Sequence, residues 1–106
     1  MRIQTNRILL LLLLTSGLIL GSIMSTNAAD YMNGAKVYAE HCEFCHGSNG
    51  EGVAGMAELK AWDQLLKPDG ELFNIIRDGQ ASMPGYDGLL TSDEILDVIV
   101  YMRTFQ

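Results

Sequence analysis

The stretch Cys42–His46, which reads Cys-Glu-Phe-Cys-His, decides how this chain can fold and what it can bind. Two cysteines separated by two residues and followed at once by a histidine are the attachment pattern of a c-type haem. Each thiol forms one thioether to the porphyrin, and the histidine becomes the proximal ligand of the iron. We therefore expect one covalent haem c, held through Cys42 and Cys45, with His46 as an iron ligand.

Other uses of two cysteines match this sequence less well. A tetrahedral zinc site would need a second pair of ligands, whereas the chain has 2 cysteines and 2 histidines in all. A thioredoxin-like redox pair would need a βαβ context, which the sequence lacks. A simple disulfide explains neither the short spacing nor the adjacent histidine. Structural or redox-active cysteines are thus the minor alternative.

An N-terminal segment of the type that directs export precedes the motif. Arg2 and Arg7 give it a basic start, the apolar run Ile8–Met24 follows, and small residues lead to Ala28 and Ala29. This layout predicts a secretory signal peptide cleaved after one of those two alanines. An uncleaved membrane anchor is the alternative, although the apolar run is short for a bilayer span. Because bacteria attach haem c outside the cytoplasmic membrane, we expect a periplasmic protein.

Cleavage would separate residues 1–29, the signal peptide, from residues 30–106, one small haem-binding domain. So small a domain buries a modest fraction of its surface and commonly needs an additional stabilising group. A covalent porphyrin would be such a group. The chain has 7 basic and 13 acidic residues, and the signal peptide removes two arginines, so the mature domain carries a net charge of −8. This charge argues against nucleic acid and for redox protein partners with a basic docking surface. We expect a monomer, with no membrane contact if the signal is cleaved.

Helical periodicity marks three stretches, separated by glycine-rich loops. The first runs from about Asp30 to about His41 and includes Gly34, which costs a helix about 1 kcal/mol relative to alanine. Close approach of another helix would explain that glycine. The second stretch has Asp69 as its expected cap and Gly79 at its end.

The third stretch is the clearest helix, because Thr91 and Glu94 form a capping box in front of an apolar stripe. The stripe follows the i, i+3, i+4, i+7 pattern, at Ile95, Val98, Ile99 and Met102. No segment alternates with the period of a strand. The expected fold is therefore all-α, with three or more helices around one haem.

The second axial ligand of the iron is expected from the loop between the second and third of these helices. Met83 precedes Pro84, which restrains the loop backbone and would stiffen the presentation of the sulfur. A methionine ligand raises the reduction potential relative to two histidines. Three alternatives remain: Met83 fills a gap in the core, His41 is the ligand, or the iron is five-coordinate. We expect ligation by His46 and Met83.

With these residues in view, the chain resembles a class I monohaem cytochrome c of the small bacterial type. The matching residues are Gly34 and Tyr38, Cys42–Gly47, Met83 with Pro84, and Val98 with Tyr101. The resemblance covers nearly all of residues 30–106. It implies the small cytochrome c fold, in which the glycine and aromatic of the first helix pack crosswise against the aliphatic and aromatic of the last helix.

One departure from that family concerns the histidine. Members usually have a proline about ten residues after it, whose carbonyl accepts the ring proton, but the segment Gly55–Leu59 has none. A backbone carbonyl from this segment can still take that role, but the sequence does not say which residue provides it. Trp62 is expected either to donate its indole proton to a haem propionate or to pack beside the haem.

Function follows from the ligation. An iron with both axial positions filled has no open site for substrate. We therefore expect an electron-transfer protein rather than an enzyme. The first hypothesis is an exported one-electron carrier between periplasmic or membrane redox partners. The second is a haem subunit, or dedicated electron acceptor, of a dehydrogenase or reductase complex. A third is an enzyme or gas sensor whose Met83 leaves the iron.

Overall fold

The computed structural model describes residues 27–60 and 64–105. Within these ranges the chain forms four helices, which are α2 (Tyr31–His41), α3 (Glu43–His46), α4 (Asp69–Asp78) and α5 (Ser92–Met102). The described residues form isolated bridges but no strand, which confirms the all-α prediction. No described helix has the length and apolarity that a membrane span requires. Most of the predicted signal peptide, and Trp62, lie outside the described residues.

Helix α5 contributes the largest share of the buried apolar side chains in the core. The predicted capping box is present, because the Thr91 side chain accepts from the Glu94 amide while Glu94 accepts from the Thr91 amide at 2.8 Å. The predicted apolar stripe is buried, at Ile95, Val98, Ile99 and Met102. The sequence therefore predicted both the start of this helix and the face that it buries.

Helix α2 crosses α5 at a glycine, as the resemblance implied. Asp30 caps α2 by accepting hydrogen bonds from two amides of its first turn. A Cβ at Gly34 would overlap the backbone carbonyl of Asp97 and come within 3.1 Å of the Cβ of Tyr101. The expected contact with Tyr101 is confirmed, while the backbone of Asp97 provides the closest approach and Val98 is fully buried beside it.

Helix α4 begins one residue earlier than the sequence suggested. Asp69 was expected to be the cap, but it is the first helical residue, and Pro68 occupies the cap position. The proline needs no amide partner, and its carbonyl accepts from Glu71 and Leu72 at 3.0 and 3.1 Å. The end of α4 at Gly79, where φ is +82°, is as predicted.

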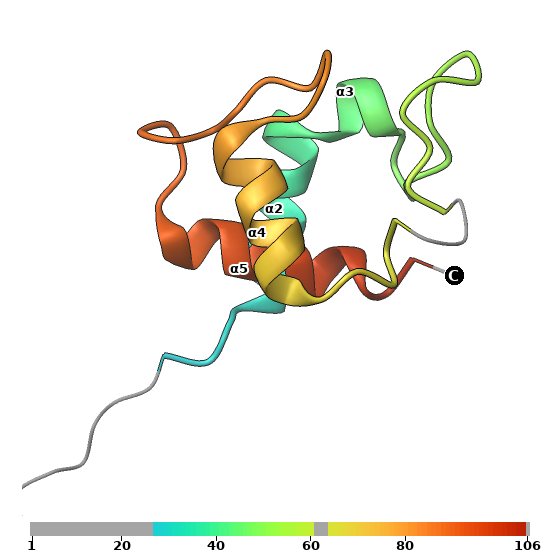
Figure 1. The fold of residues 1–106 in the computed structure, drawn as a ribbon. Coiled ribbons are helices and arrows are strands. Elements are labelled where there is room, and N and C mark those ends of the chain that lie inside the picture. The colour runs from blue at the N-terminus through green and yellow to red at the C-terminus, as the bar shows by residue number, and fades with distance from the viewer. Residues whose placement is uncertain (1–26, 61–63, 106) are drawn as a thin grey trace, which may run out of the picture.

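Helix α3 contains the last four residues of the Cys-x-x-Cys-His motif, with Cys42 as its cap, and was not expected as a separate element. It has 4 residues, too few for a periodic pattern, and the Gly47 amide ends it by donating to the Glu43 carbonyl at 2.8 Å. Figure 1 shows α3 and the loops that follow α3 and α4 at the end of the domain away from α5. The domain thus has a crossing end, where α2 meets α5, and a loop end, where α3 lies.

Candidate haem-binding site

A cavity of about 480 Å³ opens at the loop end of the domain. Its walls come from the end of α2, from α3, from the loop after α3 and from the loop after α4, and they are largely apolar. All four residues expected to hold the haem line it, namely Cys42, Cys45, His46 and Met83. Residues far apart in the sequence therefore meet at one hollow, of the type that takes a planar apolar group.

Cys42 and Cys45 bring their two sulfur atoms to this cavity. Both thiols are free in the structure, and Cys42 is the more enclosed of the two. Burial raises the pKa of the Cys42 thiol to about 11, and the neighbouring Cys45 adds to the increase. The site therefore disfavours a thiolate at neutral pH. An uncharged thioether would suit this environment, so the cysteines fit haem attachment better than a metal site that needs thiolates.

The ring of His46 is held by a backbone carbonyl. Its Nδ1 lies 2.5 Å from the carbonyl oxygen of Ala57, so the ring N–H at Nδ1 donates to that oxygen. This bond selects the tautomer in which Nε2 keeps its lone pair for a ligand. The missing proline is thus replaced by Ala57, a residue that the sequence did not identify.

Ala57 reaches this position through an unusual backbone. Its φ is +59°, a left-handed conformation that is uncommon for alanine, and Ala54 in the same loop has φ of +54°. Val53 and Met56, on either side of Ala54 and Gly55, exchange two backbone hydrogen bonds of 3.0 Å, which closes a tight turn just before Ala57. Sequence alone carries no signal for left-handed alanines, which explains why the acceptor could not be assigned from it.

Met83 sits on a second tight turn. Gln80 and Met83 exchange backbone hydrogen bonds of 3.1 and 2.9 Å, and the Met83 side chain is half-buried. The loop then passes so close to the end of α4 that a Cβ at Gly85 would lie 2.7 Å from the Asp78 carbonyl. A short, bonded turn pressed against a helix end fixes the place from which this side chain reaches the cavity.

Tyr86 is a site residue that the sequence analysis missed. Its hydroxyl donates to the carbonyl of His41 at 2.9 Å, and its amide donates to the carbonyls of Ile76 and Arg77. Burial raises the pKa of Tyr86, so the hydroxyl stays protonated and keeps donating. Tyr86 lines the cavity three residues after Met83 and ties that loop to the helix before the motif. The only signal in the sequence that could have pointed to Tyr86 as a site residue was its aromatic side chain close to Met83.

Tyr38 fixes the other end of the motif. It is 1% exposed, and its hydroxyl donates to the Gly47 carbonyl at 2.6 Å, at the end of α3. Burial raises the pKa of this hydroxyl as well. Its ring packs at 5.4 Å from that of Tyr101 and 5.0 Å from that of Phe105. The crossing of α2 with α5 and the position of α3 are thus linked through one side chain.

The alternatives weighed from the sequence can be compared with this geometry. The described residues hold no group of three His, Cys, Asp or Glu side chains placed to bind a metal ion together. The His41 ring also lines the cavity and packs edge-on against Tyr86 at 6.1 Å. The donor set and the apolar walls fit a covalently attached haem.

Comparison with known proteins places the chain among haem proteins. The family described as cytochrome c oxidase, cbb3-type, subunit III matches residues 29–102. Cytochrome c6 of Thermosynechococcus vestitus is 35% identical over 78 residues, which cover 71% of this chain and 70% of that protein. Cytochrome c6 of Nostoc sp. is 30% identical over 84 residues, with the same coverage of 71% and 70%.

Two further similarities bear on the alternatives. The cytochrome c subunit of alcohol dehydrogenase (quinone) from Gluconacetobacter polyoxogenes is 31% identical over 84 residues, which cover 67% of this chain but 18% of that protein. The solved structure of the KustC0563 c-type cytochrome matches with a TM-score of 0.62 and 24% identity, covering 69% of this chain and 96% of that one. That likeness shows the fold.

Proposed function

The chain belongs to the class I cytochrome c family and is an electron carrier with covalently bound haem c; from this premise we propose that it is exported to the periplasm and passes single electrons between redox proteins there. The observation that carries the proposal is the meeting of two thiols, one imidazole and one thioether at a single apolar cavity. The predicted signal peptide supports the export.

We propose specific roles for the four residues. Cys42 and Cys45 hold the haem as thioethers, His46 binds the iron through Nε2, and Met83 binds it through its sulfur. When bound, the haem supplies a reversible one-electron change at its iron. The residues themselves do no chemistry beyond holding their positions, which is what outer-sphere electron transfer needs.

The protein contributes rigidity and a fixed ligand set. Ala57 holds the proton at Nδ1 of His46, so the ring keeps one tautomer and one orientation. The turn that presents Met83 is anchored by Tyr86 to His41 and to the end of α4. Loops held in this way change little between two states of the iron, and a small change in structure favours fast electron exchange.

The attachment and ligation can be tested together on the exported protein. Its intact mass should equal the polypeptide from Ala29 or Asp30 plus one haem, and acid–organic extraction should leave the colour with the chain. The oxidised protein should show the weak near-infrared band of a methionine–iron bond, and Met83→Ala should abolish it. Freely extractable haem, or a band that survives the substitution, would contradict these assignments.

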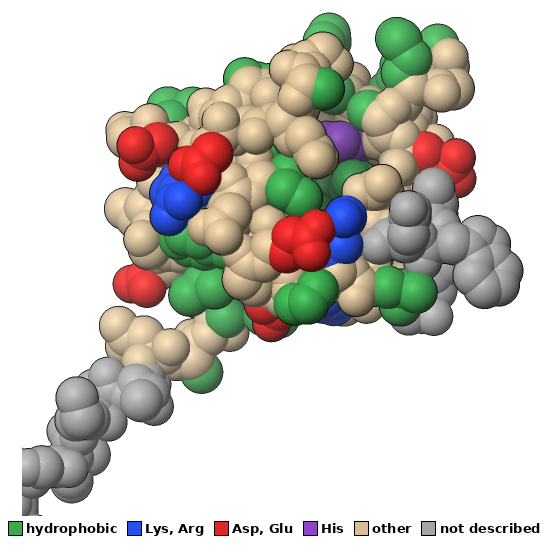
Figure 2. All heavy atoms as spheres, in the orientation of Figure 1, with side chains coloured by type: hydrophobic (Ala, Val, Ile, Leu, Met, Phe, Trp, Pro, Cys, Tyr) green, Lys and Arg blue, Asp and Glu red, His purple; other side chains and the backbone are tan. Residues whose placement is uncertain are grey.

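Docking to partners is proposed to depend on charge. Figure 2 shows acidic side chains at several places on one face of the domain, with basic side chains beside some of them. A mature charge of −8 should attract a basic partner, with screening over about 10 Å at 0.1 M salt. The rate of electron exchange with the physiological partner should fall steeply as salt rises. A flat salt profile in stopped-flow exchange would indicate apolar docking instead.

A second candidate function is supported by the similarity to a dehydrogenase's cytochrome subunit. In that case the domain would serve one particular dehydrogenase or reductase complex. Purification from the native membrane and periplasmic fractions separates the two functions. A free carrier elutes as a small monomer, whereas a dedicated subunit elutes with a large chain.

A further inference from the structure

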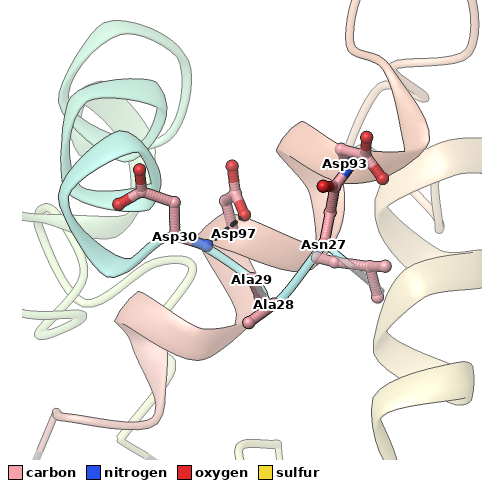
Figure 3. Close-up of a pocket in the computed structure, with 7 residues that line it drawn as sticks. Asn27, Ala28, Ala29, Asp30, Asp93 and Asp97 are labelled. Atoms are coloured by element: carbon pink, nitrogen blue, oxygen red, sulfur yellow. Dashed lines mark hydrogen bonds between the residues drawn. The ribbon is translucent and has the colours of Figure 1, made fainter. Parts of the chain in front are cut away.

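A second hollow, of about 390 Å³, lies where the chain enters α2. Figure 3 shows residues 27–30 running along α5, with the backbone nitrogen of Asp30 beside Asp97. The carboxylates of Asp30, Asp93 and Asp97 border this hollow. It is thus formed by the segment in which the predicted signal peptide ends, packed against the helix at the centre of the core.

Asp97 is a buried carboxylate without a cation. It is 7% exposed, its Oδ1 accepts from the Asp30 amide at 2.5 Å, and its Oδ2 accepts from the Asn33 side-chain amide at 2.7 Å. Both donors are neutral, and no lysine, arginine or histidine among the described residues forms an ion pair with it. A buried charge is costly unless an opposite charge lies nearby.

We propose that the charge of Asp97 is balanced by the α-ammonium group that removal of the signal peptide creates. Cleavage after Ala29 turns the nitrogen that already donates to Asp97 into this ammonium. Cleavage after Ala28 places it one residue earlier, on Ala29, which lines the same hollow. The inference rests on the proposed export, because only a processed chain has an α-ammonium here.

The other acidic groups near the hollow already have different roles. The Asp30 carboxylate caps α2, and Asp93 is exposed in the first turn of α5. Glu94 does not line the hollow but interacts with Asp97 through charge, and it belongs to the capping box of α5. None of the three is buried as Asp97 is, so each gains less from a cation because solvent screens it. Asp97 is therefore the principal partner of the new ammonium.

The position gives this pairing a structural consequence. The backbone carbonyl of Asp97 is the group over which Gly34 crosses, so one residue of α5 meets α2 through both its carbonyl and its side chain. A new cation at this point strengthens the contact between the two helices. Processing therefore stabilises the domain, and the precursor is the less stable form.

The test compares haem-loaded proteins purified from the periplasm. The first is the processed protein. The second carries an insertion of Gly-Ser-Gly between Ala29 and Asp30. The insertion moves the α-ammonium group away from Asp97 but keeps a backbone amide at Asp30. Each is also made with Asp97→Asn, and with Asp93→Asn as the matched control. Intact mass identifies every N-terminus, and absorption spectra report haem content separately, so a failure of haem binding would be seen apart from a failure of the pairing.

The insertion should raise the unfolding equilibrium constant about tenfold in the parent protein and in Asp93→Asn, but twofold or less in Asp97→Asn. The partner raises the pKa of the ammonium in the folded state. The stability gain should thus be complete below the ordinary pKa of about 8 and be lost as pH rises through the raised value.

Three results would overturn the pairing. These are an insertion effect that is unchanged by Asp97→Asn, an effect that Asp93→Asn removes equally, and a purified protein that retains its signal peptide. In the last case the spectra would still report whether haem is bound, which does not depend on the pairing.

Discussion

At the crossing end of the domain, where α2 meets α5, close contact of side chains and backbone holds the fold, whereas at the loop end hydrogen bonds to backbone carbonyls hold it. Tyr38, Ile95 and Val98 are almost completely buried at the crossing. Around the cavity, three ring groups each donate to a carbonyl, on Gly47, Ala57 and His41. Packing depends on volume, while carbonyl positions depend on the path of the loops, so the two ends should respond to different substitutions.

The largest effect is expected at the crossing, from Gly34→Ala. The new Cβ would overlap the Asp97 carbonyl, and a backbone group cannot swing aside as a flexible side chain can. We expect the free energy of unfolding to fall by about 3 kcal/mol, measured by denaturant titration of the haem-loaded protein. Helix propensity alone predicts the opposite sign, since alanine favours a helix over glycine.

Gly70→Ala provides the matched control for that experiment. Gly70 lies in α4, and a Cβ there meets nothing within 4 Å, so this variant should be unchanged or gain up to about 1 kcal/mol. If both variants behave alike, close contact at Gly34 is not what holds the crossing end.

These two ends also differ in how far the sequence predicts them. The start of α5 and its buried face follow from local signals, a capping box and a periodic stripe, which need no knowledge of the rest of the chain. The cap of α4 lies at Pro68 instead of Asp69, which shows how local chemistry moves a boundary by one residue. Resemblance to a known family supplied the glycine crossing, although the closest contact proved to be the backbone of Asp97.

At the loop end, the sequence predicted which residues line the cavity but not which hydrogen bonds hold them in place. The motif and the Met-Pro pair named the four residues that line the cavity. The Ala57 carbonyl and the Tyr86 hydroxyl could not be predicted, because one depends on a left-handed alanine and the other on a contact across 45 positions of sequence. Both supports are set by the tertiary path of the loops, which has no periodic pattern.

The next largest effect is expected from Ala57→Val, which tests the loop end. A β-branched residue at φ of +59° is strained, so we expect a loss of about 2 kcal/mol of stability. Ala54→Val, at φ of +54°, should lose a similar amount. Because the His46 ring donates to the carbonyl of Ala57 and not to that of Ala54, the first variant should also shift the reduction potential, measured by spectroelectrochemistry, while the second should leave it unchanged. Equal shifts in both variants would show that the carbonyl has no particular role.

The smallest effect is expected from Tyr86→Phe, which removes one hydroxyl from the loop end and leaves its ring. The His41 carbonyl would lose its donor, at a cost of about 1 kcal/mol. Tyr31→Phe is the matched control, since that ring packs against Tyr101 and its hydroxyl makes no hydrogen bond to the described residues. It should have no measurable effect.

The location of the Tyr86 effect matters more than its size. The bond from Tyr86 joins the loop of Met83 to the end of α2, so its loss should loosen that loop before it loosens the crossing of α2 and α5. On heating Tyr86→Phe, the near-infrared methionine–iron band should therefore disappear at a lower temperature, while the helical circular dichroism signal shifts by less. If both signals shift together, the two ends unfold as one unit, and the carbonyl bonds around the cavity support the whole domain rather than the loop end alone.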